Sequence, residues 1–411
     1  FRIGDSEFAE DAGLSGIDEF DADEIGWREQ GVSAAERGTR EASDSSKLPL
    51  NGVRVIDLSW VIAGPTSTRY LASMGAEVVK VETSSRPDPG RVGPLHDVLG
   101  QGKLGITLNL KSEGGLEAIK KLIESSDVLI ENFAPGVMER LGLGWDVLKE
   151  INPKLVMVSA SGTGQTGPTR QYSAYGTLLQ IYTGFAGLNG YPGAPTSIGM
   201  AWLDPLCGLL LAYVAIAALR STRGEGAGEG QHIDFSMVEA MLSTLPEPLV
   251  DFQTTGARSH PMGNEDAEYS PHGVFRCAGE DAWVAVAVAS QSEWEPLASL
   301  IGAGDEAIGW DRDGRRDRAE EISTLIEAWA INMSPDAAAR ELQKAGVPAS
   351  ASRASADLVD DEHLKARGFF DMLQDRDGVS RLMPTLPWSW IDDHAPSYGQ
   401  PPALGGDTRF V

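Results

Sequence analysis

Short apolar runs and amphipathic stretches alternate along the chain from residue 48 onward. The apolar runs have the length of buried strands, and they occupy residues 53–58, 76–82, 127–130 and 154–159. The stretches between them have helical spacing, which predicts helices up to residue 74 and over 115–125 and 137–151. Strand, helix and strand in this order form right-handed parallel units. The pattern therefore predicts an α/β fold whose large domain is doubly wound, or Rossmann-like.

The pattern changes near residue 256, after a strand at 231–235 and a helix at 236–242. Beyond it, a strand at 283–288 and helices that begin at Ser292, Arg318 and Pro335 predict a smaller α/β domain. The Pro-rich last part of the chain is expected to return over the surface in extended form. The predicted organisation is an acidic tail or linker at 1–46, a large domain at 47–255, a small domain at 256–356 and a return segment at 357–411.

The first 46 residues are rich in Asp, Glu, Ser and Gly, which predicts a tail or linker. Within them, residues 4–8 (GDSEF) resemble residues 406–410 (GDTRF). A similarity this short can arise by chance, because repeats are persuasive only when they are long. If the repeat is real, the first 46 residues end a preceding copy of the same module, and the chain is one module of a tandem fusion.

Charge and composition exclude several classes of partner. The formal net charge is −26, whereas nucleic acids and anionic membranes attract clustered Lys and Arg, so neither is expected as a partner. The longest uninterrupted apolar run, residues 207–219, is shorter than the ~20 residues that cross a bilayer, and it predicts a buried helix. Solubility is the simplest reason for the acidity.

The two cysteines, Cys207 and Cys277, have no paired spacing, so neither a disulfide framework nor a zinc site is predicted. This usage fits a reducing compartment. The start of the sequence shows no charged region followed by an apolar stretch, and no secretion signal is predicted. The expected location is the cytoplasm.

Two common site motifs fail in their sequence context. Residues 162–167 read G-x-G-x-x-G, but no apolar helix start follows and no acidic residue lies ~20 positions on to hold a ribose. A glycine loop that lines a pocket is favoured over an NAD site. The histidines His232, His260 and His272 lack metal-ligand spacing, so they are interpreted as structural or surface residues and no metal is predicted.

The pair Asp204-Pro205 begins the predicted buried helix and allows two interpretations. Asp is a favoured N-cap residue and Pro a favoured first helical residue, so the pair can serve only to start the helix. Its neighbours are apolar, however, and a carboxylate in apolar surroundings is costly unless it is used. The helix dipole favours the ionised form that a carboxylate nucleophile needs. Both interpretations can hold together.

An ordered set of segments resembles the class III CoA-transferases, which include formyl-CoA and carnitine CoA-transferases and the related α-methylacyl-CoA racemases. The segments are GVRVIDLS (52–59), AGP (63–65), GAEVVKVE (75–82), ITLNLK (106–111), ENFAPG (131–136) with Arg140, and WLD (202–204). The resemblance implies an interlocked homodimer in which each chain threads through its partner and returns to its large domain. It also implies coenzyme A or an acyl-CoA as substrate, with no permanently bound cofactor.

The resemblance assigns roles to particular residues. Asp204 matches the catalytic aspartate, which attacks the donor thioester and then carries CoA as an aspartyl thioester before a small carboxylic acid accepts it. The implied CoA-binding residues fall near the thiol end, the nucleotide, the adenine and a phosphate: Val61, Ala63, Arg86, Leu108, Lys111, Asn132, Phe133 and Arg140. The expected pocket walls are Ile62, Tyr172, Tyr175, Trp202 and the loop 263–272.

The chain departs from formyl-CoA transferase at two positions. Ile62 replaces a glutamine, and Thr83 replaces an arginine for which Arg86 or Arg91 can substitute. An acceptor less polar than oxalate is therefore expected. A racemase needs a histidine opposite the aspartate, but the matching segment 173–176 reads SAYG. Transferase is favoured over the alternatives, which are a 2-methylacyl-CoA racemase and a catalytically silent half of a fused transferase.

Overall fold

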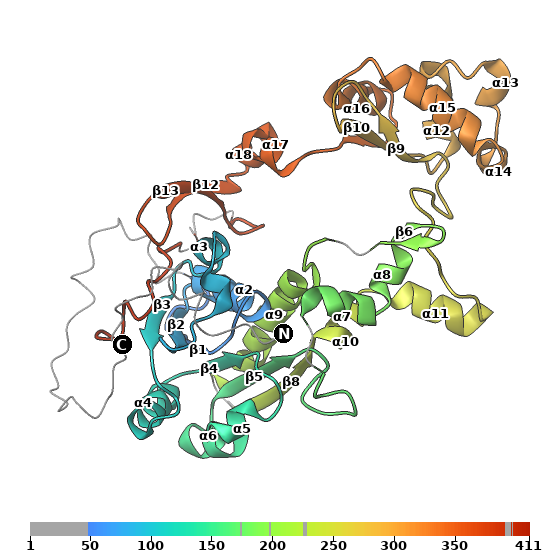
Figure 1. Ribbon diagram of the computed structural model, residues 1–411. Helices are drawn as coiled ribbons and strands as arrows, with labels where there is room; N and C mark the ends of the chain where they lie inside the picture. The colour runs from blue at the N-terminus through green and yellow to red at the C-terminus, as the bar shows by residue number, and fades with distance from the viewer. Residues whose placement is uncertain (1–47, 173–174, 197–198, 225–227, 391–395, 397) are drawn as a thin grey trace. The chain divides into compact units, whose positions relative to one another are not determined.

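The computed structural model describes residues 48–172, 175–196, 199–224, 228–390, 396 and 398–411. These residues divide into two compact units (Figure 1). The first unit comprises 48–184, 199–255 and 366–411, and the second comprises 185–196 and 256–365. The proposed tail at 1–46 lies outside the described residues, and with it the first of the two similar segments, residues 4–8.

The first unit contains a six-stranded sheet in which every neighbouring pair of strands is parallel, with the order β3-β2-β1-β4-β5-β8. This arrangement confirms the predicted parallel α/β architecture. The sequence pattern did not indicate the short strand β3. The strands are β1 Arg54–Asp57, β2 Glu77–Glu82, β3 Leu104–Thr107, β4 Val128–Glu131, β5 Val156–Ser161 and β8 Gln231–Ser236.

The order of the strands reverses between β1 and β4. From β1 the chain adds β2 and then β3 on one side, and it later adds β4, β5 and β8 on the other. The loops that leave β1 and β4 therefore diverge at the carboxyl edge of the sheet, and such a switch point opens a crevice where ligands bind in doubly wound folds. The fold alone directs attention to the residues that follow these two strands.

Two helices of the first unit, α4 and α10, begin at a serine whose side chain caps the helix. Ser112 Oγ, for example, accepts the N–H of Gly115 at the start of α4. The single helix expected at 137–151 was wrong, because Gly142 (φ 71°) ends one helix and a second begins after Gly144. The helices are α2 Ala63–Ser73, α3 Leu95–Leu99, α4 Glu113–Glu124, α5 Val137–Arg140, α6 Trp145–Ile151, α7 Gly176–Tyr182, α9 Leu203–Thr222, α10 Met237–Leu242 and α11 Pro246–Thr255, with a 3-10 turn at Pro89–Arg91.

Helix α9 is longer than the apolar run suggested, because it extends beyond that run at both ends to 20 residues. By length and composition it is the one helix of the described chain that could cross a membrane, and 44% of its apolar window is buried within the protein. It packs against α2, and Gly208 permits the close approach: a Cβ there would lie 2.6 Å from Thr66 Cβ. Core helices of soluble proteins pass the same test of length and composition, so this feature is weak evidence for a membrane span.

The second unit has its own antiparallel sheet and helical layer (Figure 1). Its strands β9, β10 and β11 pair in the order β11-β10-β9, and its core is centred on the fully buried Trp294. The main elements are β9 His272–Arg276, β10 Trp283–Ala287, α12 Gln291–Leu300, α13 Asp305–Ile308, α14 Arg312–Arg316, α15 Ala319–Ala330, α16 Pro335–Lys344, β11 Ala349–Ala351 and α17 Ser355–Asp360. Residues 185–196, with the short α8 Phe185–Leu188, β6 Gly190–Tyr191 and β7 Ala194–Pro195, belong to this unit.

After α18 (Glu362–Ala366), the chain forms the hairpin of β12 (Phe370–Gln374) and β13 (Ser380–Pro384). Its last residues then run beside the edge strand β3. Gly105 donates to Asp407 Oδ2 and accepts from the Asp407 N–H, both at 2.9 Å, and the Thr107 N–H donates to Thr408 Oγ1 at 3.0 Å. These bonds satisfy backbone groups that an edge strand otherwise exposes.

Candidate active site

Two side chains join the loops that diverge at the switch point. The Trp60 N–H donates to Asn132 Oδ1 at 2.7 Å, and Asn132 Nδ2 donates to the Trp60 carbonyl at 2.9 Å. The ring of Phe133 meets the Trp60 indole edge to face, with 5.9 Å between centroids. Asn132 and Phe133, two of the predicted adenine-site residues, are therefore held at the carboxyl edge of β4 beside the end of β1.

A cation is added to this edge by the loop that follows β2. The guanidinium of Arg86 lies 4.9 Å from the centroid of the Trp60 ring, while the side chain remains exposed. Stacking on an indole face orients a guanidinium and leaves its N–H groups available to an anion. Arg86, predicted to bind CoA as one of two candidates to replace an arginine of formyl-CoA transferase, thus lies at the carboxyl edge of the sheet with its guanidinium exposed. Arg91, the other candidate, is instead buried and paired with Glu82.

The turn between β1 and α2 contains the predicted residues of the thiol end. Val61 has a left-handed backbone with φ 65°, Ile62 is the N-cap of α2, and Ala63 is its first residue. No side chain caps this helix. Its first N–H groups and its dipole therefore present positive potential where the turn meets the crevice.

Asp204 is the second residue of α9, and Trp202 occupies the N-cap position. The capping interpretation of Asp204 was thus wrong by two residues. Gly208 lies one turn further along the same helix face, where a Cβ would come within 2.9 Å of the Ala63 carbonyl. The contact between α2 and α9 therefore brings the Asp204 turn close to the start of α2.

Helix α7 packs directly against the aspartate. A Cβ on Gly176 would lie only 1.7 Å from Asp204 Oδ2, so the carboxyl group occupies the space that any other residue would fill. One turn later, Gln180 Oε1 accepts the Leu203 N–H at 3.0 Å, and the Gln180 Nε2 has no hydrogen-bond partner among the described residues although the side chain is fully buried. Sequence reasoning missed both residues; their spacing of four on a short helix was the available signal.

Burial raises the pKa of Asp204 to about 6, and hydrogen bonding with its own backbone N–H opposes that rise. The group is therefore mostly ionised at neutral pH but poorly stabilised as a charge. A carboxylate in this condition gains by forming a covalent bond that removes its charge. Among the described residues, Asp204 therefore lacks the cationic partner of a structural ion pair, and it is a candidate functional carboxylate.

A second perturbed carboxyl group lies at the end of β4. Burial raises the pKa of Glu131 to about 7, although its carboxylate accepts the Phe133 N–H at 2.8 Å. The hydroxyl of Ser159 also bonds to it, and Ser159 in turn lies 2.9 Å from His232 Nε2. Glu131 was quoted within a motif but was not predicted as a site residue.

The other predicted residues have mixed positions. Leu108 is buried at the end of β3, whereas Lys111 and Arg140 are exposed beyond β3 and at the end of α5. The proposed pocket residues Tyr172, Tyr175 and Trp202 are 60%, 76% and 49% exposed. The loop 263–272 belongs to the second unit, where the Gly263 N–H bonds to the Gly190 carbonyl.

The glycine loop at 162–167 is not built for a pyrophosphate. Asp234 accepts the Gln165 N–H at 2.7 Å, which places a carboxylate against the loop, and α7 begins only at Gly176. In the described part of the chain, no group of three or more His, Cys, Asp and Glu side chains is arranged to hold a metal ion. His232 stacks on Trp145 with 5.5 Å between centroids, as expected for a structural histidine.

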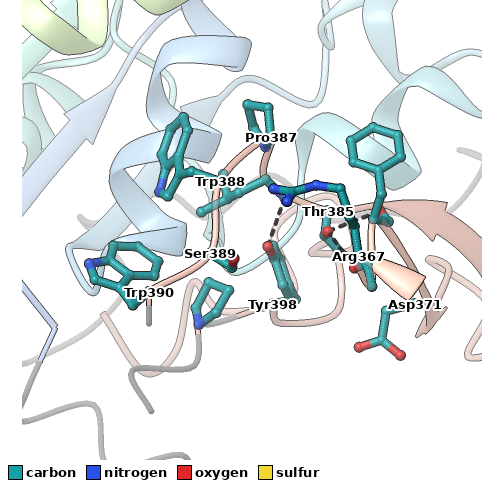
Figure 2. Close-up of a pocket in the computed structure, with 12 residues that line it drawn as sticks. Arg367, Asp371, Thr385, Pro387, Trp388, Ser389, Trp390 and Tyr398 are labelled. Atoms are coloured by element: carbon teal, nitrogen blue, oxygen red, sulfur yellow. Dashed lines mark hydrogen bonds between the residues drawn. The ribbon is translucent and has the colours of Figure 1, made fainter. Parts of the chain in front are cut away.

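A separate cavity of about 270 Å³ lies in the segment that follows α18 (Figure 2). Tyr398 crosses it, with its hydroxyl accepting the Leu386 N–H at 2.8 Å, and Trp388 stacks on Tyr70 of α2. Its lining contains none of the predicted site residues: Arg367, Gly368, Phe369, Asp371, Thr385, Leu386, Pro387, Trp388, Ser389, Trp390, Pro396 and Tyr398. The cavity is therefore distinct from the switch-point crevice.

Comparison with known proteins agrees with this geometry. The family described as CoA-transferase family III matches residues 50–408. The chain is 31% identical to a succinyl-CoA–D-citramalate CoA-transferase of Chloroflexus aurantiacus, covering 79% of this chain and 84% of that protein. It is 35% identical to an acetyl-CoA:oxalate CoA-transferase of Acetobacter aceti, covering 74% and 80%.

A solved structure of a CaiB/BaiF family protein from Brucella suis superposes with a TM-score of 0.79 at 29% identity, covering 88% of this chain and 98% of that one. The match spans both units and agrees with the parallel sheet described above. The family and its general chemistry, the transfer of CoA, follow from these similarities. The chain belongs to CoA-transferase family III, a family of enzymes that act on CoA thioesters.

Proposed function

We propose that this enzyme transfers CoA from an acyl-CoA donor to a small carboxylic acid, with Asp204 as the nucleophile. The Asp204 carboxylate attacks the thioester carbonyl, and the tetrahedral adduct expels CoA as a thiolate, which leaves a mixed anhydride between Asp204 and the donor acid. The thiolate then attacks the Asp204 carbonyl, which releases the donor acid and leaves an aspartyl-CoA thioester. The acceptor carboxylate repeats both steps in reverse, so that its acyl-CoA departs and Asp204 is regenerated.

The observation that carries this proposal is the state of the Asp204 carboxyl group. It is packed on Gly176 at the first turn of α9, near the uncapped start of α2, and burial raises its pKa to about 6. Each covalent step replaces its charge by a neutral acyl group. Backbone N–H groups at the start of α2 are suitable donors for the oxyanion that develops at the carbonyl.

Relatives suggest the class of donor and acceptor. Similar proteins include a succinyl-CoA–D-citramalate CoA-transferase, a succinyl-CoA–L-malate CoA-transferase alpha subunit and a succinate–glutarate CoA-transferase. We therefore propose a short acyl-CoA such as succinyl-CoA as donor. Ile62 and Thr83 replace polar residues of formyl-CoA transferase, and these replacements support an acceptor less polar than oxalate.

A second chain of the same fold is the proposed partner. Helix α11 has no buried residue, and Leu249, Val250 and Phe252 on it are 46–57% exposed; on α7, Leu178 and Ile181 are each 55% exposed. Apolar surface of this extent favours a protein contact. The proposed assembly is an interlocked homodimer or a pairing with a second module, and the proposed location is the cytoplasm. A relative from Chloroflexus aurantiacus is named as having alpha and beta subunits.

The test is peptide mass spectrometry after incubation with succinyl-CoA, acetyl-CoA and longer acyl-CoA esters in heavy water, alongside Asp204→Ala. A CoA adduct on the Asp204 peptide that is absent from the variant supports the transferase mechanism. Deuterium at the substrate α-carbon without an adduct indicates the racemase alternative instead. If neither signal appears with any ester, the chain is a silent module and the proposal is wrong.

A further inference from the structure

The turn that follows β1 contains a residue in an unfavourable backbone conformation. Val61 is β-branched, yet its φ is 65°, in the left-handed region that side chains of this shape rarely adopt. Such a conformation persists only where the surrounding structure fixes it. The environment of Val61 therefore has to supply interactions that hold the turn.

Three side chains, the buried Lys80 and Asp88 and the half-buried Asn132, bind the backbone of this turn at four points. Lys80 Nζ donates to the Ser59 carbonyl at 2.8 Å, and Asn132 bonds to both the N–H and the carbonyl of Trp60. The Val61 N–H donates to Asp88 Oδ1 at 2.9 Å. Gly90, in the 3-10 turn Pro89–Arg91, packs against Val61. A Cβ on Gly90 would lie 2.9 Å from the Val61 carbonyl oxygen.

Asp88 is itself fixed by an ion pair. Its Oδ2 lies 2.9 Å from Lys80 Nζ, and the side chains of Lys80 and Asp88 are only 2% and 4% exposed. Its Oδ1 also accepts the Gly90 N–H at 2.8 Å, and its own N–H donates to Glu82, which is paired with Arg91. Asp88 therefore has no freedom to follow Val61 if the turn relaxes.

We propose that Asp88, held by Lys80, is a positioning residue that keeps Val61 left-handed and thereby fixes the start of α2 against the Asp204 turn. This inference rests on the proposed function, because the start of α2 is where the thioester carbonyl is placed. Asp88 acts through the Val61 N–H and has no contact of its own with the reacting atoms. Lys80 acts one step further away, through Asp88 and the Ser59 carbonyl.

The experiment is a double-mutant cycle with Asp88→Ala and Val61→Gly. Glycine adopts positive φ without strain and needs no clamp. We therefore expect Asp88→Ala to lower kcat/KM by at least about tenfold in the wild-type background but by less than about threefold in the Val61→Gly background. Asp88→Asn, which keeps an acceptor for the Val61 N–H, should lose less activity than Asp88→Ala. Equal losses in both backgrounds would overturn the proposal.

Asp97→Asn is the matched control. Asp97 is a buried aspartate with a cationic partner, Arg376 at 3.0 Å, but it has no bond to the turn. Hydrogen exchange of a peptide covering residues 58–66 gives a second measurement that does not need turnover. Faster hydrogen exchange in Asp88→Ala than in Asp97→Asn supports the positioning role of Asp88. If the wild-type protein transfers CoA to none of the acids tested, that result rejects the proposed function but not the positioning role. Equal exchange in the two variants rejects the positioning role.

Discussion

Asp57 and Asp204 are buried carboxyl groups of the same unit, and their surroundings are opposite. Asp57 accepts hydrogen bonds from Ser59, Thr68 and Lys103, the last at 3.0 Å. Burial alone would raise its pKa, but the Lys103 and Lys80 ammonium groups and the two hydroxyls hold the pKa well below its usual range. Asp204 has no comparable partners among the described residues, and burial raises its pKa to about 6.

Under the proposed mechanism, this contrast distinguishes a structural carboxylate from a reactive one. A carboxylate with an ammonium and two hydroxyl donors is stabilised as an ion and is a poor nucleophile. A buried carboxylate without such donors remains reactive. Its burial destabilises the folded state, and other interactions in the protein have to offset this destabilisation. Four predictions test whether this difference in partners, rather than position in the fold, determines the two roles.

The largest effect is expected at the structural pair. Asp57→Ala leaves the Lys103 ammonium buried without its counter-charge, so we expect the free energy of unfolding to fall by about 3–5 kcal/mol. Urea unfolding followed by circular dichroism measures this loss. Asp204→Ala, the matched variant, should leave stability unchanged or slightly higher. Similar losses in the two variants would remove the distinction between them.

The next effect concerns the packing of the nucleophile. Gly176→Ala puts a methyl group where Asp204 Oδ2 now lies, so the carboxyl group has to rotate away. We expect CoA transfer to fall by roughly 100-fold, the effect of misplacing a reacting group by about 1 Å. Gly187→Ala is a suitable control, because nothing lies within 4 Å of a Cβ there. Wild-type rates in Gly176→Ala would show that this contact does not position the carboxylate.

The pH dependence should be moderate and of known sign. Because only the ionised carboxylate attacks, kcat should fall about tenfold per pH unit below the Asp204 pKa of about 6 and level off above it. The raised pKa of Asp204 also affects the free energy of unfolding, which changes with pH in the direction opposite to kcat. A raised carboxyl pKa favours the folded state at low pH, and this contribution is lost as pH rises from 3.8 to about 6. Rate profiles and melting temperatures from pH 4 to about 8 would check both signs.

The smallest expected effect is the loss of one hydroxyl beside Asp57. Thr68 Oγ1 donates to Asp57 Oδ2 and accepts from Lys103 Nζ, each at 2.6 Å. Thr68→Val keeps the shape but removes both bonds, and it should cost about 1–3 kcal/mol of unfolding free energy. Differential scanning calorimetry at neutral pH measures it. A cost equal to that of Asp57→Ala would mean that the hydroxyl, and not the ammonium, stabilises the carboxylate.

The sequence predicted the parallel sheet well because buried strands of this type are continuous apolar runs with clear punctuation. The runs at 53–58 and 76–82 became β1 and β2 with their ends shifted by one residue. It failed at β3, the edge strand Leu104–Thr107, whose outer side bonds to the distant C-terminal residues Asp407 and Thr408. It also failed at 137–151, where glycines interrupt a helical pattern.

The sequence indicated candidate site residues but not the residues that hold them in place. The apolar neighbours of Asp204 made it a candidate, but its catalytic role and the choice of Asn132 came from the resemblance to the class III CoA-transferases. Sequence reasoning missed Gly176, Gln180 and Asp88 because their contacts are with residues 23 to 28 positions away in the chain. Examples are the hydrogen bonds between Gln180 and Leu203 and between Asp88 and Val61. Apart from the spacing of four between Gly176 and Gln180, no periodicity in the sequence indicates these contacts.

The glycine at position 208 has a consequence for how this enzyme could be altered. Gly208 of α9 packs against the Thr66 side chain and the Ala63 carbonyl of α2, so the lack of a side chain at Gly208 sets the separation between the helix that starts at Ala63 and the helix that carries Asp204. Residues that choose the acceptor acid can therefore be exchanged while the reaction frame keeps its dimensions. The choice of acceptor acid and the rate of the chemical step can then be changed independently. Directed evolution toward new acids should therefore leave Gly208 unchanged.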